Sequence, residues 1–311
     1  MNMFYQVTLT ILVITILLIL ILYFLLDREN GDLTKYQASS NYKFAQLTHG
    51  LTAYKEFGSN KNTPIILVHG GTLPSEGYSE FCQNLSENNY WVICYDQFGR
   101  GYSDRPRIQY SMNIYQQQLD ELLTHLEIDN FILYGVSMGA PIAIQYANDN
   151  IDRTLAVGIQ VPVVHINNHI FKLLSVPTVG EVMIRFFGLP LIKKRALEWS
   201  NDDFVSKDFI NKYIKQLSLP GSEYSLLSAS RKLISKNYNE TYKTFSKNNI
   251  PLHIAYADDD TEVSPKSVQS IIKINPNSDV FIFTGGHAGS SRIPDKIVNI
   301  FINFLSKNLN Q

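Results

Sequence analysis

The chain has 311 residues, of which 45% are hydrophobic and 18% are charged, so it is long enough to bury one large core. Its formal net charge of −1 gives no overall attraction to nucleic acid. Its two cysteines, Cys82 and Cys94, have no paired spacing of the kind that marks a disulfide framework or a metal site. We therefore expect two inert core thiols, and they do not identify the redox compartment.

The N-terminal segment differs in kind from the rest of the chain. No side chain is charged before Asp27, and residues 4–26 in a helix would span about 34 Å, enough to cross a bilayer. A cleaved signal peptide is the alternative, but the segment lacks a basic start and ends in YFLLDREN without a small-residue cleavage site. We expect an uncleaved single-pass anchor over 4–26 and a polar tether over 27–40. Arg28 and Lys35, beyond the anchor, favour a cytoplasmic body.

After the tether, short apolar runs alternate with helical stretches. Two antiparallel strands over 42–58 are expected to form a hairpin, because polar residues and His49-Gly50 separate two apolar runs. Further strands are expected over 64–71, 90–99, 131–133, 153–161, 251–260 and 279–286, and helices over 75–89, 111–126, 140–147 and 295–309. Continuously apolar strands that alternate with helices predict a mostly parallel, doubly wound α/β sheet that is covered on both faces.

One segment interrupts this alternation. Residues 161–249 contain no convincing strand, several helical stretches and four prolines. The segment also carries 13 Lys and Arg residues against 7 Asp and Glu residues. We interpret it as a helical cap inserted before the penultimate strand, so that residues 41–160 and 250–311 form the domain that contains the sheet.

The stretch NFILYGVSMGAPIAIQYA places Ser137 between an apolar strand and an apolar helix. Gly135 and Gly139 flank it two residues away on each side, where only glycine allows a very tight turn. This G-x-S-x-G pattern in a strand–turn–helix context is typical of a nucleophile elbow, which exposes a serine hydroxyl at the edge of a sheet. A glycine-rich turn without chemistry is the alternative.

A nucleophilic serine requires a base and an acid that orients the base. His287 lies in a glycine-rich loop just past the last strand, where functional groups of open α/β sheets collect. Asp258, Asp259 and Asp260 follow the preceding strand, and one of them can reach a histidine while the others remain solvated. The order serine, aspartate, histidine along the chain is that of α/β-hydrolase triads.

From Tyr42 to the C-terminus the chain resembles the α/β-hydrolase superfamily. LVHGG resembles its oxyanion loop, YDQFGRGYSDRP the segment after its fourth strand, GVSMG the elbow, and ADDDTEVSP and GGHAG its acid and histidine loops. In the family the acid commonly comes third after a small residue and three before a valine. Ala257 and Val263 therefore imply Asp260 as the acid, with Asp259 as the alternative.

The resemblance also implies an oxyanion hole. Its donors would be the backbone N–H groups of Gly71, the residue after His-Gly, and of Met138, the residue after the nucleophile. Thr72 is the less favoured candidate for the first donor. Ser103 lies next to an aspartate but lacks the elbow pattern, so we expect it to support the site without reacting.

These features predict a serine hydrolase that cleaves carboxylic esters, with a monoacylglycerol or similar lipid as substrate, through an acyl-enzyme. No metal or organic cofactor and no nucleic acid is implied. A proline iminopeptidase-like aminopeptidase is the alternative enzyme, since YDQ is similar to that group, and a carbon–carbon bond hydrolase is a third possibility. An alternative that is not an enzyme is a membrane-tethered binding protein that has this fold but has lost catalysis. The sequence does not indicate the oligomeric state.

One cap segment has a composition that suits a membrane interface. Val179 to Trp199 combines apolar residues with the basic residues Arg185, Lys193, Lys194 and Arg195. We hypothesise that its apolar face enters the bilayer surface while its cations approach anionic head groups. The alternative is that the apolar face packs over the active site.

Overall fold

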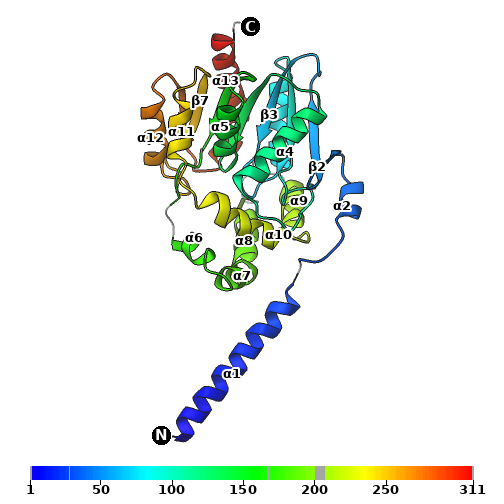
Figure 1. Cartoon of the computed structure of the whole chain (residues 1–311), viewed down its shortest axis with the longest axis vertical. Coiled ribbons are helices and arrows are strands. Elements are labelled where there is room, and N and C mark those ends of the chain that lie inside the picture. Colours follow the sequence, from blue (N-terminus) through cyan, green and yellow to red (C-terminus); the bar gives the residue numbers. More distant parts are fainter. Residues whose placement is uncertain (1, 28, 167–168, 200–206, 310–311) are drawn as a thin grey trace.

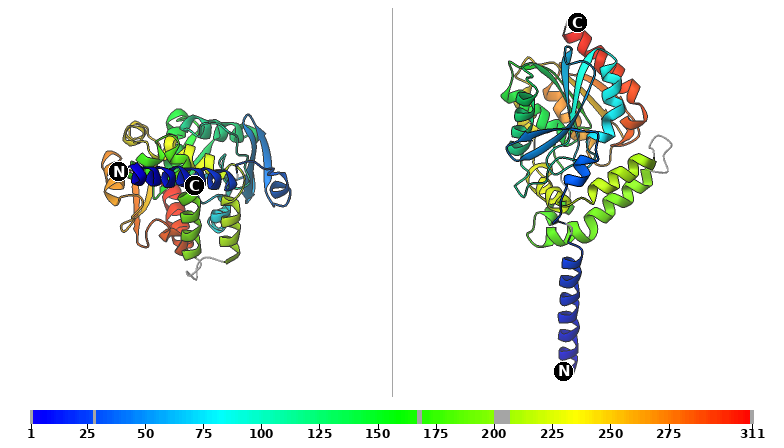
Figure 2. Two further views of the ribbon diagram at one scale, coloured as in Figure 1. Left: turned by 90° about the horizontal axis from the view of Figure 1, so that it is seen from below. Right: turned by 90° about the vertical axis from the view of Figure 1, so that its right-hand side faces the viewer.

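The computed structural model describes residues 2–27, 29–166, 169–199 and 207–309, and it has three parts (Figure 1). A central sheet carries helices on both faces, a group of helices lies beyond one edge of that sheet, and the long helix α1 projects from the same end of the body (Figures 1 and 2). The active-site candidates lie between the sheet and the second group of helices.

The sheet has eight strands in the order β1-β2-β4-β3-β5-β6-β7-β8. Strand β2 pairs antiparallel with both β1 and β4. The six strands from β4 to the far edge of the sheet, in the order β4-β3-β5-β6-β7-β8, run parallel. This confirms the mostly parallel sheet that the sequence predicts. The strands are β1 (Lys43–Leu47), β2 (Gly50–Phe57), β3 (Thr63–Val68), β4 (Tyr90–Tyr95), β5 (Phe131–Val136), β6 (Thr154–Gln160), β7 (Leu252–Ala257) and β8 (Asp279–Phe283).

Two apolar cores cover the two faces of the sheet. On β3, Ile66 and Val68 belong to one core, while Ile65 and Leu67 belong to the other. Alternate side chains of a strand point to opposite faces, so a strand that is covered on both sides must be apolar throughout. Helices α4 (Met112–His125), α5 (Gly139–Asp149) and α12 (Pro265–Ile274) cover the first face, and α3 (Ser79–Ser86, after a 3₁₀ turn at Ser75–Tyr78) and α13 (Pro294–Asn308) cover the second.

Among its described residues, the segment between β6 and β7 consists of helices joined by turns and loops, with one isolated bridge between His165 and Asn237. It comprises α6 (His169–Leu174), α7 (Val179–Met183), the π-helical turn η2 (Ile184–Gly188), α8 (Leu189–Trp199), α9 (Lys207–Leu217), α10 (Ser222–Ala229), the π-helical turn η3 (Ser230–Ile234) and α11 (Asn239–Phe245). A separate small core joins α6 through α10. Helix α11 instead buries Tyr242 and Phe245 in the core of the sheet. We therefore use "the cap" for α6 through η3.

The N-terminal helix α1 (Asn2–Leu25) contains a 23-residue stretch, Met3–Leu25, with an apolar window of which none is buried. It is the one helix among the described residues that is long and apolar enough to cross a membrane, and a signal sequence has the same properties. The tether that follows contains a short helix, α2 (Thr34–Ala38), which the sequence does not predict. The Gln37 amide of α2 donates hydrogen bonds to the Asp104 carboxylate and the Tyr102 carbonyl, and these bonds hold the tether to the body.

Candidate active site

The site is built around the turn that joins β5 to α5, where Ser137 has a positive φ of 53°. This left-handed conformation is costly for a residue with a side chain, and it persists because the surroundings leave no alternative. A Cβ on Gly135 would lie 2.6 Å from the Gly139 carbonyl, and a Cβ on Gly139 would collide with the Val68 carbonyl. The two glycines therefore permit the tight turn that exposes the serine hydroxyl.

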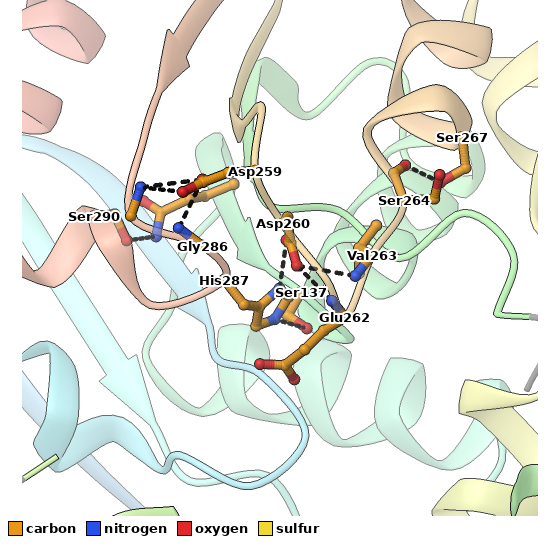
Figure 3. Close-up of polar contacts among 12 residues, drawn as sticks. Ser137, Asp259, Asp260, Glu262, Val263, Ser264, Ser267, Gly286, His287 and Ser290 are labelled. Carbon is orange, nitrogen blue, oxygen red and sulfur yellow. Dashed lines mark hydrogen bonds and ion pairs between the residues drawn. The ribbon is translucent and has the colours of Figure 1, made fainter. Parts of the chain in front are cut away.

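The structure brings Ser137, His287 and Asp260 together in one hydrogen-bonded chain (Figure 3). The distance from His287 Nε2 to Ser137 Oγ is 2.9 Å, and that from His287 Nδ1 to Asp260 Oδ2 is 2.7 Å. The three residues follow β5, β8 and β7 respectively, so they meet at the carboxyl edge of the parallel strands. The imidazole thus lies between a hydroxyl that it can deprotonate and a carboxylate that fixes its orientation.

Asp260 is buried, with a side chain that is 3% exposed, and its second oxygen is held by backbone groups. Asp260 Oδ1 accepts hydrogen bonds from the N–H of Glu262 at 2.7 Å and of Val263 at 3.0 Å. Burial by itself raises the pKa of this carboxyl, but the hydrogen bonds from His287 and from the two backbone groups outweigh burial and hold the pKa below its ordinary value. Asp260 is therefore an anion at neutral pH.

The adjacent Asp259 points to a different group. Its carboxylate accepts hydrogen bonds from the N–H of Gly285 at 3.0 Å and of Gly286 at 2.8 Å, in the loop that carries His287. These backbone bonds lower the pKa of Asp259. Of the two candidate acids, the structure places Asp260 against the imidazole and Asp259 against the loop backbone (Figure 3).

Gly71 and Met138 face each other across the approach to the serine. A Cβ on Gly71 would lie 3.6 Å from Met138 Sδ. Within the described part of the chain, neither backbone N–H of these two residues has a hydrogen-bond partner. Both groups are thus available as donors, as an oxyanion hole requires.

An arginine that the sequence analysis did not single out holds the Gly71 loop in place. Arg100 Nε donates a hydrogen bond to the Gly71 carbonyl, and Arg100 Nη1 donates to the Gly99 carbonyl and to Ser225 Oγ of α10, each at 3.0 Å. Arg100 therefore connects the cap to the loop that carries the candidate oxyanion donor. The sequence signal was its place in the family-like segment DQFGRGYSD.

His69 supports the same loop through hydrogen bonds to backbone groups. It is fully buried, its Nδ1 donates to the Gly70 carbonyl at 2.7 Å, and its Nε2 accepts from the Gln97 N–H at 3.0 Å. Burial lowers its pKa to about 3, so the ring is neutral at pH 7. A neutral ring with one donor and one acceptor fits a structural role.

Ser103 is also structural, as the sequence analysis expects. It is fully buried, its Oγ accepts a hydrogen bond from the Ala53 N–H at 2.9 Å, and the same Oγ donates to the Asp96 carbonyl at 2.5 Å. Both bonds tie the segment after β4 to neighbouring backbone. No hydrogen bond joins it to Ser137 or His287 among the described contacts.

The loop that carries His287 has a second support, which sequence reasoning missed. Gln160, the last residue of β6, donates from Nε2 to Ser290 Oγ at 2.6 Å and accepts from the Tyr134 hydroxyl at 2.9 Å. A glutamine at the end of an apolar strand was the available signal. Together with Asp259, Gln160 fixes the loop at both ends of the histidine.

The cap lies over these residues. Arg195 of α8 forms an ion pair with Glu262, two residues past Asp260, and Ile234 of η3 lies 3.5 Å from the place that a Gly71 Cβ would occupy. The His287 side chain remains 18% exposed. A substrate would therefore bind between the cap and the sheet edge.

Residues 63–290 match a family model described as alpha/beta hydrolase fold. Over 114 residues the chain is 32% identical to a proline iminopeptidase of Clostridium botulinum, a match that covers 33% of this chain and 39% of that protein. The chain spans about two fifths of the length of the curated relatives that it matches.

Solved structures show the same fold. A bromoperoxidase from Bacillus anthracis is similar with a TM-score of 0.72 and 21% identity, and the match covers 86% of this chain and 100% of that one. An esterase from Exiguobacterium antarcticum is similar with a TM-score of 0.71 and 16% identity, and the match covers 85% and 99%. At these identities the likeness concerns the fold alone.

Proposed function

Because the chain belongs to the alpha/beta hydrolase family, we propose that it is a serine hydrolase that cleaves carboxylic esters through an acyl-enzyme. The observation that carries this proposal is the continuous contact from Ser137 Oγ through the His287 ring to Asp260, at 2.9 and 2.7 Å. These are hydrogen-bonding distances at which a base can take a proton from a nucleophile.

In the proposed reaction, Ser137 Oγ attacks the ester carbonyl carbon while His287 Nε2 takes the hydroxyl proton. The oxyanion that forms is stabilised by the N–H groups of Gly71 and Met138. As the tetrahedral intermediate collapses, the bond to the alcohol oxygen breaks and His287 returns the proton to that leaving group. A water molecule then attacks the carbonyl carbon of the acyl-enzyme while His287 Nε2 takes a proton from the water. The bond to Ser137 Oγ breaks, His287 returns the proton to Ser137, and the carboxylic acid is released. Asp260 stabilises the imidazolium in both half-reactions.

We further propose that the substrate is a lipid ester and that α1 anchors the enzyme in a membrane. The 23-residue apolar stretch Met3–Leu25 supports an anchor, since about 20 apolar residues cross a bilayer. The body would lie on the cytoplasmic side, because the first basic residues, Arg28 and Lys35, follow the stretch. An enzyme held at a bilayer meets lipid esters at high local concentration.

The proline iminopeptidase relative makes an aminopeptidase the second candidate. Such an enzyme must bind the α-ammonium group of its substrate, and a carboxylate is the natural counter-ion. The cap acids whose side chains the structure describes, Glu181 and Glu223, are each paired with an arginine of the cap. The lack of an unpaired cap carboxylate among the described side chains favours the esterase.

Active-site labelling tests the nucleophile. A fluorophosphonate probe is expected to label the wild-type protein and not Ser137→Ala, whose kcat falls by up to about 10⁶-fold. The matched control is Ser267→Ala, which removes an exposed hydroxyl from the nearby helix α12 and is expected to retain labelling. Equal labelling of Ser137→Ala and wild type would overturn the assignment.

A substrate panel tests the substrate class. Turnover of p-nitrophenyl esters of increasing acyl length and of monoacylglycerols is compared with turnover of proline p-nitroanilide. Preference for long-chain esters supports the lipid esterase, and dominant release of proline would establish the aminopeptidase instead.

Carbonate extraction tests the anchor. We expect the full chain to stay with the washed membranes, and we expect the N-terminus of the mature protein to lie before residue 4. A mature protein that begins after Leu26 would identify a cleaved signal sequence.

A further inference from the structure

Arg185 of η2 lies where the cap meets the end of α1. Its side chain is only 6% exposed, and all three of its guanidinium nitrogens have acceptors. Nη1 donates to the Tyr23 carbonyl at 2.8 Å, Nη2 to Asp27 at 3.1 Å, and Nε to Glu223 of α10 at 2.7 Å. The guanidinium also lies 4.0 Å from the centre of the Tyr23 ring. One cap residue thus binds both the last turns of α1 and the tether.

This arrangement corrects part of the interfacial hypothesis drawn from the sequence. Arg185 does not face lipid head groups, because it is buried and paired. Arg195 is paired with Glu262 of the acid loop. Two of the four basic residues of this segment, Arg185 and Arg195, therefore bind protein carboxylates, and the membrane contact proposed below is argued from apolar side chains.

Glu29 makes a second connection between the tether and the cap. Its carboxylate accepts hydrogen bonds from the N–H groups of Glu223 at 3.0 Å and Tyr224 at 3.2 Å, in the first turn of α10. N–H groups in the first turn of a helix have no partner within the helix, so a carboxylate satisfies and stabilises them. Arg185 and Glu29 together hold α10 and η2 against the chain that leaves α1.

Exposed apolar side chains gather on the same part of the cap. Helices α6 and α7 lie at the end of the body from which α1 projects (Figures 1 and 2). Their segment and η2 carry five large apolar side chains that are between 41% and 65% exposed, which we name the apolar cap face: Ile170, Leu173, Val176, Val179 and Phe187. Scattered exposed apolar residues are ordinary, but a group of five in 18 residues is typical of a surface that contacts another apolar phase.

We propose that Arg185 and Glu29 clamp the cap to the end of the membrane anchor, so that the apolar cap face lies in the surface of the same bilayer. The proposal rests on the anchor proposed above. The apolar cap face would contact the acyl-chain region beneath the lipid head groups, because it lies at the end of the body from which α1 projects. Arg185 binds the carbonyl of Tyr23, two residues before α1 ends, which places η2 at the depth where the span leaves the hydrocarbon.

A docked cap also narrows the class of substrate that can reach Ser137. The cap lies between the sheet edge and α1 (Figure 1), so a cap seated on the bilayer places Ser137 on the membrane side of the sheet. A lipid ester from the adjoining leaflet would then reach the serine beneath the cap. A soluble ester would gain nothing from the docking.

Depth-dependent quenching on the full chain tests the docking. The chain is reconstituted in phosphatidylcholine nanodiscs, and the fluorophore NBD is attached to Phe187→Cys or, as matched control, to Ile151→Cys. Both positions are exposed, at 65% and 47%, but Ile151 follows α5 at the edge of the sheet remote from the cap. The native cysteines are buried and remain unlabelled.

Brominated acyl chains are expected to quench the label at position 187 by at least half and to leave the label at position 151 unchanged. Equal quenching of the two labels, in a chain that stays in the disc, would overturn the docking but not the anchor. The docking would also be overturned if a second chain, and not lipid, covered the face at position 187. A chain that leaves the disc on carbonate treatment would overturn the anchor and the docking together.

Clamp variants test the role of Arg185. In Arg185→Gln with the label at 187, quenching is expected to fall at least twofold, whereas Lys243→Gln, which breaks an exposed ion pair on α11, is expected to leave it unchanged. If Arg185→Gln does not fold, Asp27→Asn weakens the same contact while leaving the pair with Glu223 intact. Unchanged quenching in the folded variants would overturn the clamp.

Discussion

The aspartates that follow the carboxyl ends of the sheet strands are held differently from the glutamates of the cap. In the sheet domain, Asp96, Asp259 and Asp260 each accept hydrogen bonds from at least two backbone N–H groups. In the cap, Glu223 is bound by Arg185, and both oxygens of Glu181 are bound by Arg231. Backbone amides hold one set and arginine side chains hold the other.

The difference follows from how each region is positioned. Loops at the edge of a parallel sheet begin at strand ends whose separation is set by the hydrogen-bond ladder, so their N–H groups can be aimed at one carboxylate. Helices of the cap have no such ladder, and long side chains bridge the variable distances between them. A backbone-held carboxylate keeps its geometry when the substrate binds, which suits a group that must orient a base.

The largest effect is expected from Asp260→Asn. The amide cannot stabilise the imidazolium or enforce the same tautomer, so kcat should fall by about 10⁴-fold. Asp259→Asn is the matched control, and it should lose less than about tenfold, because it weakens only bonds to the loop backbone. Ester kinetics of both variants check the comparison, and a reversed ranking would move the acid to Asp259.

Arg100→Met is expected to lower kcat by up to about 100-fold with little change in KM, because the Gly71 loop loses the donor that positions it. Arg100→Lys should restore part of the loss. Arg153→Met is the control, since Arg153 also binds two backbone carbonyls, those of Asp129 and Ile128, but at the start of β6. Equal losses in both methionine variants would indicate a general effect on folding.

Because burial lowers the pKa of His69, we expect the stability of the protein to depend on pH. The pKa of this histidine is about 3 in the fold and about 6.5 when unfolded, so its contribution is complete above pH 6.5 and is lost as the pH falls toward 3. Between pH 7 and pH 5 the free energy of unfolding should drop by about 2 kcal/mol from this group. Denaturant titrations at both pH values should show a smaller drop in His69→Gln than in the wild-type protein.

The smallest effect is expected in the cap. Glu181→Gln breaks a partly exposed pair with Arg231 and should cost about 1 kcal/mol or less in the free energy of unfolding, with ester turnover unchanged. Thermal unfolding and kinetics of this variant complete the comparison. A loss of turnover as large as that of Asp260→Asn would show that the two kinds of carboxylate do not differ in function.

The sequence alone was enough to predict the alternating strands and helices, the mostly parallel sheet and the position of Ser137 in an elbow. Each depends on local rules: the apolar run of a strand covered on both faces, the helical period, and the glycines that a tight turn requires. His287 was also within reach, because it follows the last strand in a glycine-rich loop. These features depend on neighbours within a few residues.

Tertiary structure decided what depends on residues far apart in the chain. Asp259 and Asp260 are adjacent and chemically identical, and only the course of the loop after β7 directs Asp260 to the imidazole. Arg100 meets Gly71 across 29 residues, and Arg185 meets Tyr23 across 162. Side-chain direction and burial arise from the packing of separate elements, and no local pattern records which elements will meet.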